Sequence, residues 1–223
     1  SNNTQIVNSS FNSCSVLGDG GVIAWFGPNG QITDVDFLYM AATNGGGIYG
    51  SAENMTITNS TFGYGTSWMG FQGSNEYKGS GSAIYWFDSN RLELINVSFN
   101  NLEAHAHGAG IAAINCNDSR LYNVTIKGSI ALKNGGGVYW TDSNNLTIEA
   151  CNFTDTAAAF GGGALYLYNV DATVKDTLFN HTQAPWSYGG AMYVHADVDI
   201  INSTFLQFEA QRDQGYALYF ESG

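Results

Sequence analysis

The stretch GVYWTDSNNLTIEACNF, residues 137–153, decides the fold because it joins two motifs that recur along the whole chain. Its first part places a glycine before Val138 and two aromatic residues. Its second part is a run rich in β-branched residues that closes on Phe153, and a polar turn at 143–145 separates the two parts. β-branched and aromatic runs bounded by such turns are typical of strands, so the stretch predicts short β-strands.

The second motif recurs at a nearly constant spacing. Its copies close on eight equivalent residues, which are Phe11, Phe37, Phe62, Phe99, Ile126, Phe153, Phe179 and Phe205. Six of the seven spacings are 25–27 residues and the third is 37, while a glycine-rich motif lies between successive copies. A period of about 26 residues without helical spacing is too short for a propeller blade, which needs about 40 residues. We therefore expect an all-β, right-handed parallel β-helix of about eight coils with no terminal caps.

Equivalent residues should form columns, because successive coils of a β-helix lie about 4.8 Å apart. The Phe column and an aliphatic column in the glycine-rich motif should face the interior. A third column, three residues before each Phe, is rich in Asn and Asp, which tolerate the left-handed backbone of a bend. This bend column comprises Asn8, Asp34, Asn59, Asn96, Asn123, Ala150, Asp176 and Asn202.

The repeats extend along the whole chain, so residues 1–223 are expected to form one domain. The long third spacing predicts a loop insertion at 63–79, which carries four large aromatic residues. Long aromatic loops are often functional, although this one could equally cap the solenoid or brace a neighbour.

Both ends of the chain stop partway through a coil, and the end 217–223 joined to the start 1–11 continues the repeat. Two explanations stay open. The chain is a segment of a longer solenoid, or copies of it stack head to tail as a filament. Stacked copies would repeat every ~38 Å, from eight coils at about 4.8 Å each.

The composition narrows the function. Seven Lys and Arg against nineteen Asp and Glu give a net charge of −12, which argues against nucleic-acid binding. No apolar run is long enough to span a membrane. Cys14, Cys116 and Cys151 lie in different coils or columns, so no internal disulfide is expected, although Cys14 could reach an adjoining subunit.

Eleven Asn-X-Ser/Thr sequons predict covalent N-glycans on an extracellular or cell-surface protein. Six are the favoured carriers, namely Asn2, Asn54, Asn117, Asn145, Asn152 and Asn180. Five belong to the bend column and are less favoured, because a side chain in a ladder could be closed to a glycan; they are Asn8, Asn59, Asn96, Asn123 and Asn202.

A tyrosine column follows the aliphatic column and should point outward by strand alternation. It comprises Tyr49, Tyr85, Tyr139, Tyr166, Tyr193 and Tyr219. These rings either form a ribbon that stacks on sugars or a neighbouring fibre, or stack on one another for stability alone.

Three further features bear on catalysis or metal binding. Glu103, His105 and His107 alternate and form a weak candidate for a Zn²⁺ site, so no metal or other cofactor is expected. Asp34 and Asp36 would share a face, as paired carboxylates of a glycoside hydrolase do. The seven basic residues are scattered rather than convergent, so no enzyme activity is expected.

The alternation of glycine-rich and Asn-rich segments ending in Phe resembles the repeats of chlamydial polymorphic outer-membrane proteins and archaeal adhesin-like proteins. That resemblance implies surface display and adhesion. The sequence thus favours a segment or subunit of a glycosylated extracellular fibre or surface stalk. The alternatives are an adhesin-like carbohydrate-binding module and, third, a polysaccharide lyase or hydrolase.

Overall fold

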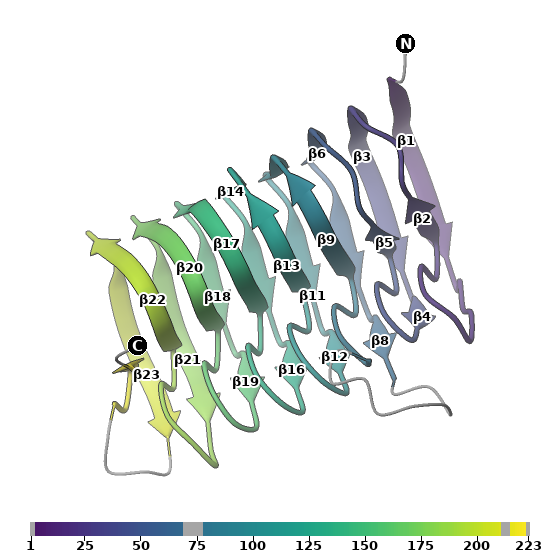
Figure 1. Ribbon diagram of the computed structural model, residues 1–223. Helices are drawn as coiled ribbons and strands as arrows, with labels where there is room; N and C mark the ends of the chain where they lie inside the picture. The colour runs from purple at the N-terminus through teal and green to yellow at the C-terminus, as the bar shows by residue number, and fades with distance from the viewer. Residues whose placement is uncertain (1–2, 69–77, 211–214, 222–223) are drawn as a thin grey trace.

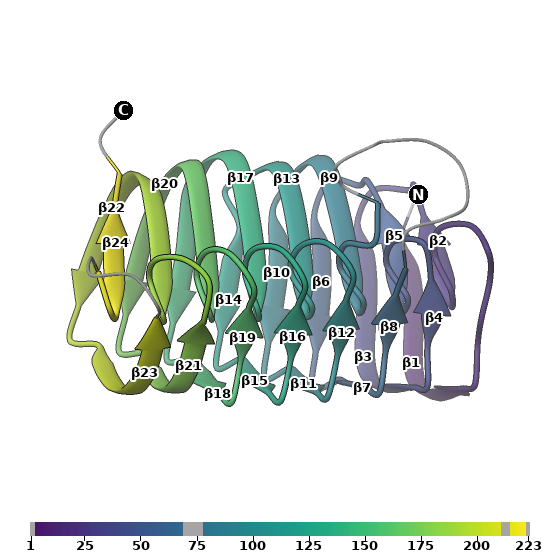
Figure 2. The same ribbon diagram turned by 90° about the horizontal axis from the view of Figure 1, so that it is seen from below.

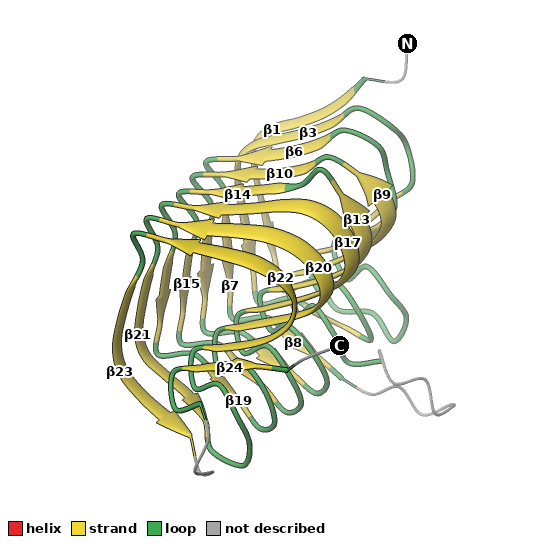
Figure 3. Cartoon of the chain, turned by 60° about the vertical axis from the view of Figure 1, so that its left-hand side comes forward, coloured by secondary structure: helices red, strands yellow, loops and turns green. Residues whose placement is uncertain are grey.

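The computed structural model describes residues 3–68, 78–210 and 215–221, which form a parallel β-solenoid. Its coils stack along one axis from the N-terminal to the C-terminal end, and each strand pairs in parallel with the equivalent strand of the next coil (Figure 1). Strands and loops account for the whole of the described chain (Figure 3). The all-β parallel solenoid predicted from the repeats is confirmed.

The strands form four parallel rows, and every coil after the first contributes to all four (Figure 2). The first row is built from the first parts of β1 (Thr4–Asn12) and β3 (Gly30–Leu38), then β6 (Met55–Thr58), β10 (Leu92–Ile95) and β14 (Arg120–Tyr122), and the later parts of β17 (Val138–Glu149), β20 (Leu165–Lys175) and β22 (Met192–Ile201). The second row is built from the later parts of β1 and β3, then β7 (Thr61–Gly63), β11 (Ser98–Asn100), β15 (Thr125–Lys127), β18 (Asn152–Thr154), β21 (Leu178–Ala184) and β23 (Thr204–Ala210).

The third row is short and follows a second bend. It consists of β4 (Ala41–Ala42), β8 (Thr66–Ser67), β12 (Glu103–Ala104), β16 (Ile130–Ala131) and β19 (Ala157–Ala158), with the ends of β21 and β23. The fourth row consists of β2 (Ile23–Trp25), β5 (Ile48–Gly50), β9 (Ile84–Asn90), β13 (Ile111–Asn117), the first parts of β17, β20 and β22, and β24 (Leu218–Phe220).

The predicted columns are present in the strand register. Phe62 pairs with Phe37 before it and with Phe99 after it, and all three side chains are fully buried. Their rings stack at centroid separations of 4.5 and 5.1 Å. Burying a Phe side chain contributes about 1.5–3 kcal/mol, so the repeated column is a main source of stability.

The bend column adopts the left-handed backbone expected of it. All eight members have φ between 48° and 57°. Seven are Asn or Asp, residues whose short polar side chains make this conformation accessible, and Ala150 is the exception. A second set of bends uses glycine, for example Gly135 at φ 66°, where a Cβ atom would lie 2.3 Å from the carbonyl oxygen of Val138.

The boundaries predicted for the insertion at 63–79 are too wide. Gly63 lies in β7, and Thr66 and Ser67 form β8, where they pair with Ala41 and Ala42 of the preceding coil. The first residues of the predicted loop are therefore part of the coil, because they continue its strand register. Residues 69–77, including Phe71 and Tyr77, lie outside the described residues.

Candidate functional surfaces

The sequon asparagines of the bend column are exposed, which removes the objection that they are closed off within a ladder. Their side chains still form an amide ladder along the axis. Asn96 donates its Nδ2–H to Oδ1 of Asn59 at 3.0 Å, and Asn123 donates to Oδ1 of Asn96 at 2.8 Å. At the C-terminal end, Asn202 donates to Asp176. The ladder thus lies on the surface.

The other sequons lie in three kinds of place. Asn54 lies in a bend before β6, Asn117 is the last residue of β13, and Asn145 lies within β17 where the strand register shifts. Each donates its Nδ2–H to a side-chain oxygen of the preceding coil. Asn152 and Asn180 are half-buried in β18 and β21. Asn2 lies outside the described residues.

The tyrosine column lies on the outer side of the fourth row, but its rings cover one another. Tyr49 and Tyr85 stack at 5.5 Å, and Tyr166 stacks on Tyr139 at 5.2 Å and on Tyr193 at 4.6 Å. The interplanar angles are 10–17°, so the ring faces are turned toward each other and the edges face outward. Tyr219 continues the column at 5.2 Å.

The column is interrupted by Ala112, which pairs with Tyr85 before it and with Tyr139 after it. The ring of His107 packs against Tyr139 at a centroid distance of 4.3 Å and is buried. His107 therefore supplies an aromatic neighbour where the column lacks one.

The weak metal candidate is divided between two environments. His105 Nε2 lies 3.6 Å from Glu103 Oε1 at the surface, whereas His107 is buried against Tyr139. In the described parts of the chain, no group of three His, Cys, Asp or Glu side chains is placed to hold a metal ion. The predicted alternation failed because β12 ends at Ala104, so the three residues do not continue one strand.

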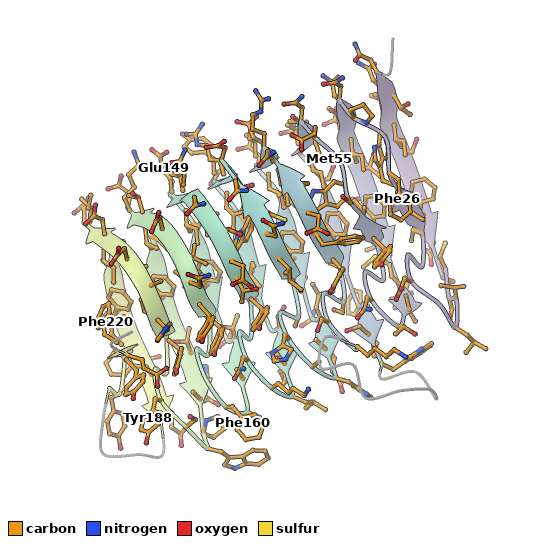
Figure 4. All side chains as sticks on the ribbon, in the orientation of Figure 1. Phe26, Met55, Glu149, Phe160, Tyr188 and Phe220 are labelled. Carbon is orange, nitrogen blue, oxygen red and sulfur yellow. The ribbon has the colours of Figure 1, made fainter. Side chains whose placement is uncertain are left out.

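Exposed aromatic side chains also lie outside the tyrosine column. Phe160 and Trp186 are 52% and 62% exposed, and Tyr188 stacks on Tyr219 at 4.4 Å. Phe160 and Tyr188 both lie at the lower edge of the stack in Figure 4, far from Phe26 at the opposite end. Phe160 and Trp186 thus expose aromatic surface that is not part of the column.

The charged side chains noted in the sequence lie in different environments. Asp34 occupies a bend within β3 and Asp36 lies on the outer face of the later part of the same strand, and both are exposed. Glu149 forms ion pairs of 2.9 Å with both Arg120 and Lys175, and these hydrogen bonds, that from Lys175 first, lower the pKa of Glu149. Arg120 and Lys175 thus have a structural partner in Glu149.

An open groove of about 650 Å³ lies over β17, β20 and β22 near the C-terminal end of the stack. It is lined by Asn144, Asn145, Asp171, Asp197 and Asp199, with four apolar or hydroxyl residues between them. Its acidic character matches the net charge of the chain and does not by itself specify a ligand.

The two buried thiols occupy places that hydroxyls fill in other coils. Ser143 Oγ donates to the Thr141 carbonyl and accepts the N–H of Cys116, both at 2.8 Å. Cys116 repeats this pattern, since its Sγ donates to the Ile114 carbonyl at 3.4 Å and accepts the N–H of Ser89. Burial raises the pKa of Cys116 to about 12, so this thiol is a structural hydrogen-bonding group.

Cys151 follows the same rule in the column after the Asn bends. Its Sγ donates to the Glu149 carbonyl at 3.2 Å and accepts the N–H of Val124, and burial raises its pKa to about 11. All three cysteines, including the half-buried Cys14, are free thiols. Sequence reasoning missed the role of this position, which the repeated Ser or Thr directly after the bend residue could have indicated.

Comparison with known families identifies the fold. Residues 62–219 match the model of the family described as the right-handed β-helix region. No curated protein and no solved structure matches the chain. In the part of the chain that the structure describes, no helix has the length and apolar character needed to cross a bilayer. The family match extends over most of the eight coils, and the chain belongs to the right-handed β-helix family.

Proposed function

We propose that this chain is an extracellular structural element, one segment or subunit of a glycosylated β-helical fibre or surface stalk. The observation that carries the proposal is the continuity of the columns. The interior side chains of the middle coils are fully buried, whereas Ile6 and Phe11 in the first coil and Ile200 and Phe205 in the last are only partly buried. A further coil at either face, from the same chain or another copy, would cover them.

The surface features agree with a structural role. Tyrosine rings stack on one another, Asn side chains form a ladder, and buried hydroxyls and thiols bond the next coil. Each of these interactions ties neighbouring coils together along the axis. On this proposal the chain has no catalytic activity and needs no cofactor besides covalent glycans, and its partners are copies of itself or flanking coils.

Labelling of the native source with an antibody against the chain, followed by electron microscopy, tests this function. Label on extracellular filaments or stalks of uniform width is the expected result. Label confined to the cell interior, or to compact particles in the medium, would count against it.

Carbohydrate binding is a second candidate, favoured by the exposed Phe160 and Trp186 rather than by the tyrosine column. A glycan array probed with the purified chain and its Trp186→Ala variant tests it. Binding that depends on Trp186 supports this candidate, and Phe26→Ala is the control because Phe26 is equally exposed at the other end of the stack.

A further inference from the structure

A regularity in the bend column is not explained by the fold. The residue two positions after the bend carries a hydroxyl in five coils, at Ser10, Thr61, Ser98, Thr125 and Thr204. These are the five coils in which the bend residue is Asn. In the three coils whose bend residue is Asp34, Ala150 or Asp176, the same position holds Asp36, Asn152 or Leu178. In this column, a hydroxyl two positions after the bend therefore occurs only where the bend residue is asparagine.

The strands themselves do not require this hydroxyl. Its position lies on the outer face of the second row, next to the inward-facing Phe, and all five side chains are exposed or half-exposed. Among the described residues these five hydroxyls make no side-chain hydrogen bond. By contrast, the neighbouring Ser60 is buried, donates to the Thr58 carbonyl at 2.8 Å and accepts the N–H of Val35 at 3.2 Å. Asp36 and Leu178 show that the outer position accepts other side chains.

A second bend column serves as an internal control. Asn115 and Asn169 also have positive φ, and each donates its Nδ2–H to an aspartate of the preceding coil at 2.9 Å. Two residues later the chain has Asn117 and Asp171, neither of which has a hydroxyl. An Asn bend with an amide ladder thus does not bring a hydroxyl with it. The hydroxyl that follows the first bend column matches the acceptor motif for N-linked glycans.

The amide ladder leaves room for a glycan. Asn96 accepts through Oδ1 from Asn123 and donates through Nδ2 to Asn59, so its carbonyl and N–H bonds point in opposite directions along the axis. The side-chain amide is planar and has two N–H bonds. The N–H bond that runs antiparallel to the C=O bond is the one trans to the oxygen, and this is the bond that donates in the ladder. When Nδ2 carries a sugar, that hydrogen is kept. The sugar replaces the other hydrogen, which is cis to the oxygen and points away from the Cβ atom. A sugar on Nδ2 would therefore project outward while the ladder bond remains.

We propose that Asn8, Asn59, Asn96, Asn123 and Asn202 are N-glycan acceptors that form a row along one edge of the solenoid. The transfer needs a polyprenyl-pyrophosphate-linked oligosaccharide as donor. A bond forms between Nδ2 and C1 of the sugar, the bond between C1 and the phosphate oxygen breaks, Nδ2 loses a proton and the pyrophosphate leaves. The inference rests on the proposed extracellular location, and it reverses the order of preference expected from the sequence alone.

Peptide mapping of the full chain, secreted from a eukaryotic host, tests the row. The glycans are first removed with an N-glycosidase in heavy-oxygen water, which converts each glycosylated Asn to a labelled Asp. The expected result is a heavy-oxygen aspartate at Asn59, Asn96 and Asn123, with Asn115 and Asn169 unlabelled. An intact mass equal to the bare polypeptide, or label only at sequons outside the bend column, would overturn the proposal.

Two neighbouring hydroxyls give a matched pair of variants. Thr61→Ala should remove the glycan mass at Asn59 and leave the unglycosylated protein's Tm unchanged, since the Thr61 hydroxyl makes no hydrogen bond within the described part of the chain. Ser60→Ala keeps the sequon, so it should keep the glycan and lower the Tm. If Thr61→Ala lowers the Tm as Ser60→Ala does and leaves the mass pattern unchanged, the hydroxyl is structural and the proposal is wrong. Filaments seen without any glycan would leave the proposed structural function standing.

Discussion

Asn123 donates its side-chain N–H to Oδ1 of Asn96, one coil earlier, at 2.8 Å. Both residues have a left-handed backbone and both are exposed. The contact therefore couples two bends at the surface. It is one of a series of such bonds along the axis, and the series stops at Ala150, which follows Asn123 in the column.

Replacing Ala150 by Asn should stabilise the solenoid. An amide at this bend could bond Asn123, a gain of about 0.5–1.5 kcal/mol, and Asn adopts φ +54° more readily than Ala. Chemical unfolding of Ala150→Asn measures the effect. Ala150→Gly relieves the backbone without an amide, so equal gains for both variants would show that the ladder bond contributes nothing.

Gly135→Ala should destabilise the chain far more than Gly137→Ala. At Gly135 the left-handed backbone costs about 1–2 kcal/mol for Ala, and the Cβ atom would meet the Val138 carbonyl oxygen at 2.3 Å. At Gly137 the nearest contacts are 3.1 Å, and the same column holds Ala164 and Ala191. The free energies of unfolding of the two variants check this difference, and equal losses would disprove the role given to the bend.

Cys116→Ser should be tolerated within about 1 kcal/mol, because a hydroxyl can make the bonds of the thiol. Cys116→Ala should cost about 1–3 kcal/mol by leaving the N–H of Ser89 without its acceptor. Unfolding in urea compares the two.

An aromatic disulfide reagent should label only Cys14 in the native protein at neutral pH, and rapid labelling of Cys116 would contradict its burial.

Glu149 should contribute to an acid-dependent loss of stability. Hydrogen bonds from Lys175 and then Arg120 lower its pKa in the folded state below the ordinary 4.5. A lowered folded pKa means that this contribution is present above about pH 4.5 and is lost as the pH falls through the folded value. The Tm of Glu149→Gln should therefore lie below that of the wild type at pH 6 and approach it at pH 3. Asp36→Asn is the control, because Asp36 is an exposed carboxylate outside any ion pair in the described chain. The difference in Tm between this variant and the wild type should not shrink from pH 6 to pH 3.

The repeat predicts the fold well because each column is one residue type in one environment. Phe62 lies over Phe37 because both close the same motif, and Asn59 bends because Asn accepts positive φ. The site features were harder to predict because they depend on neighbours about 26 residues away. Glu149, for instance, meets Arg120 and Lys175 from the coils on either side.

The alternation of strand residues gave the direction of the tyrosines but not their packing. The ring faces of Tyr166 are covered by Tyr139 and Tyr193, because the coil spacing suits face-to-face stacking. The contact of His107 with Tyr139 depends on a bend whose course no motif indicates. The wide boundaries of the 63–79 loop had a related cause, since Thr66 and Ser67 continue a strand that has no hydrophobic alternation.

The axial spacing of the native material tests the central claim most directly. Cryo-electron microscopy of filaments from the native source should show coils about 4.8 Å apart, with the Phe column running unbroken through every boundary. Where separate copies stack, the density should repeat every ~38 Å. Discrete particles about 38 Å long, with Ile6 and Phe205 facing solvent at their two ends, would contradict the account.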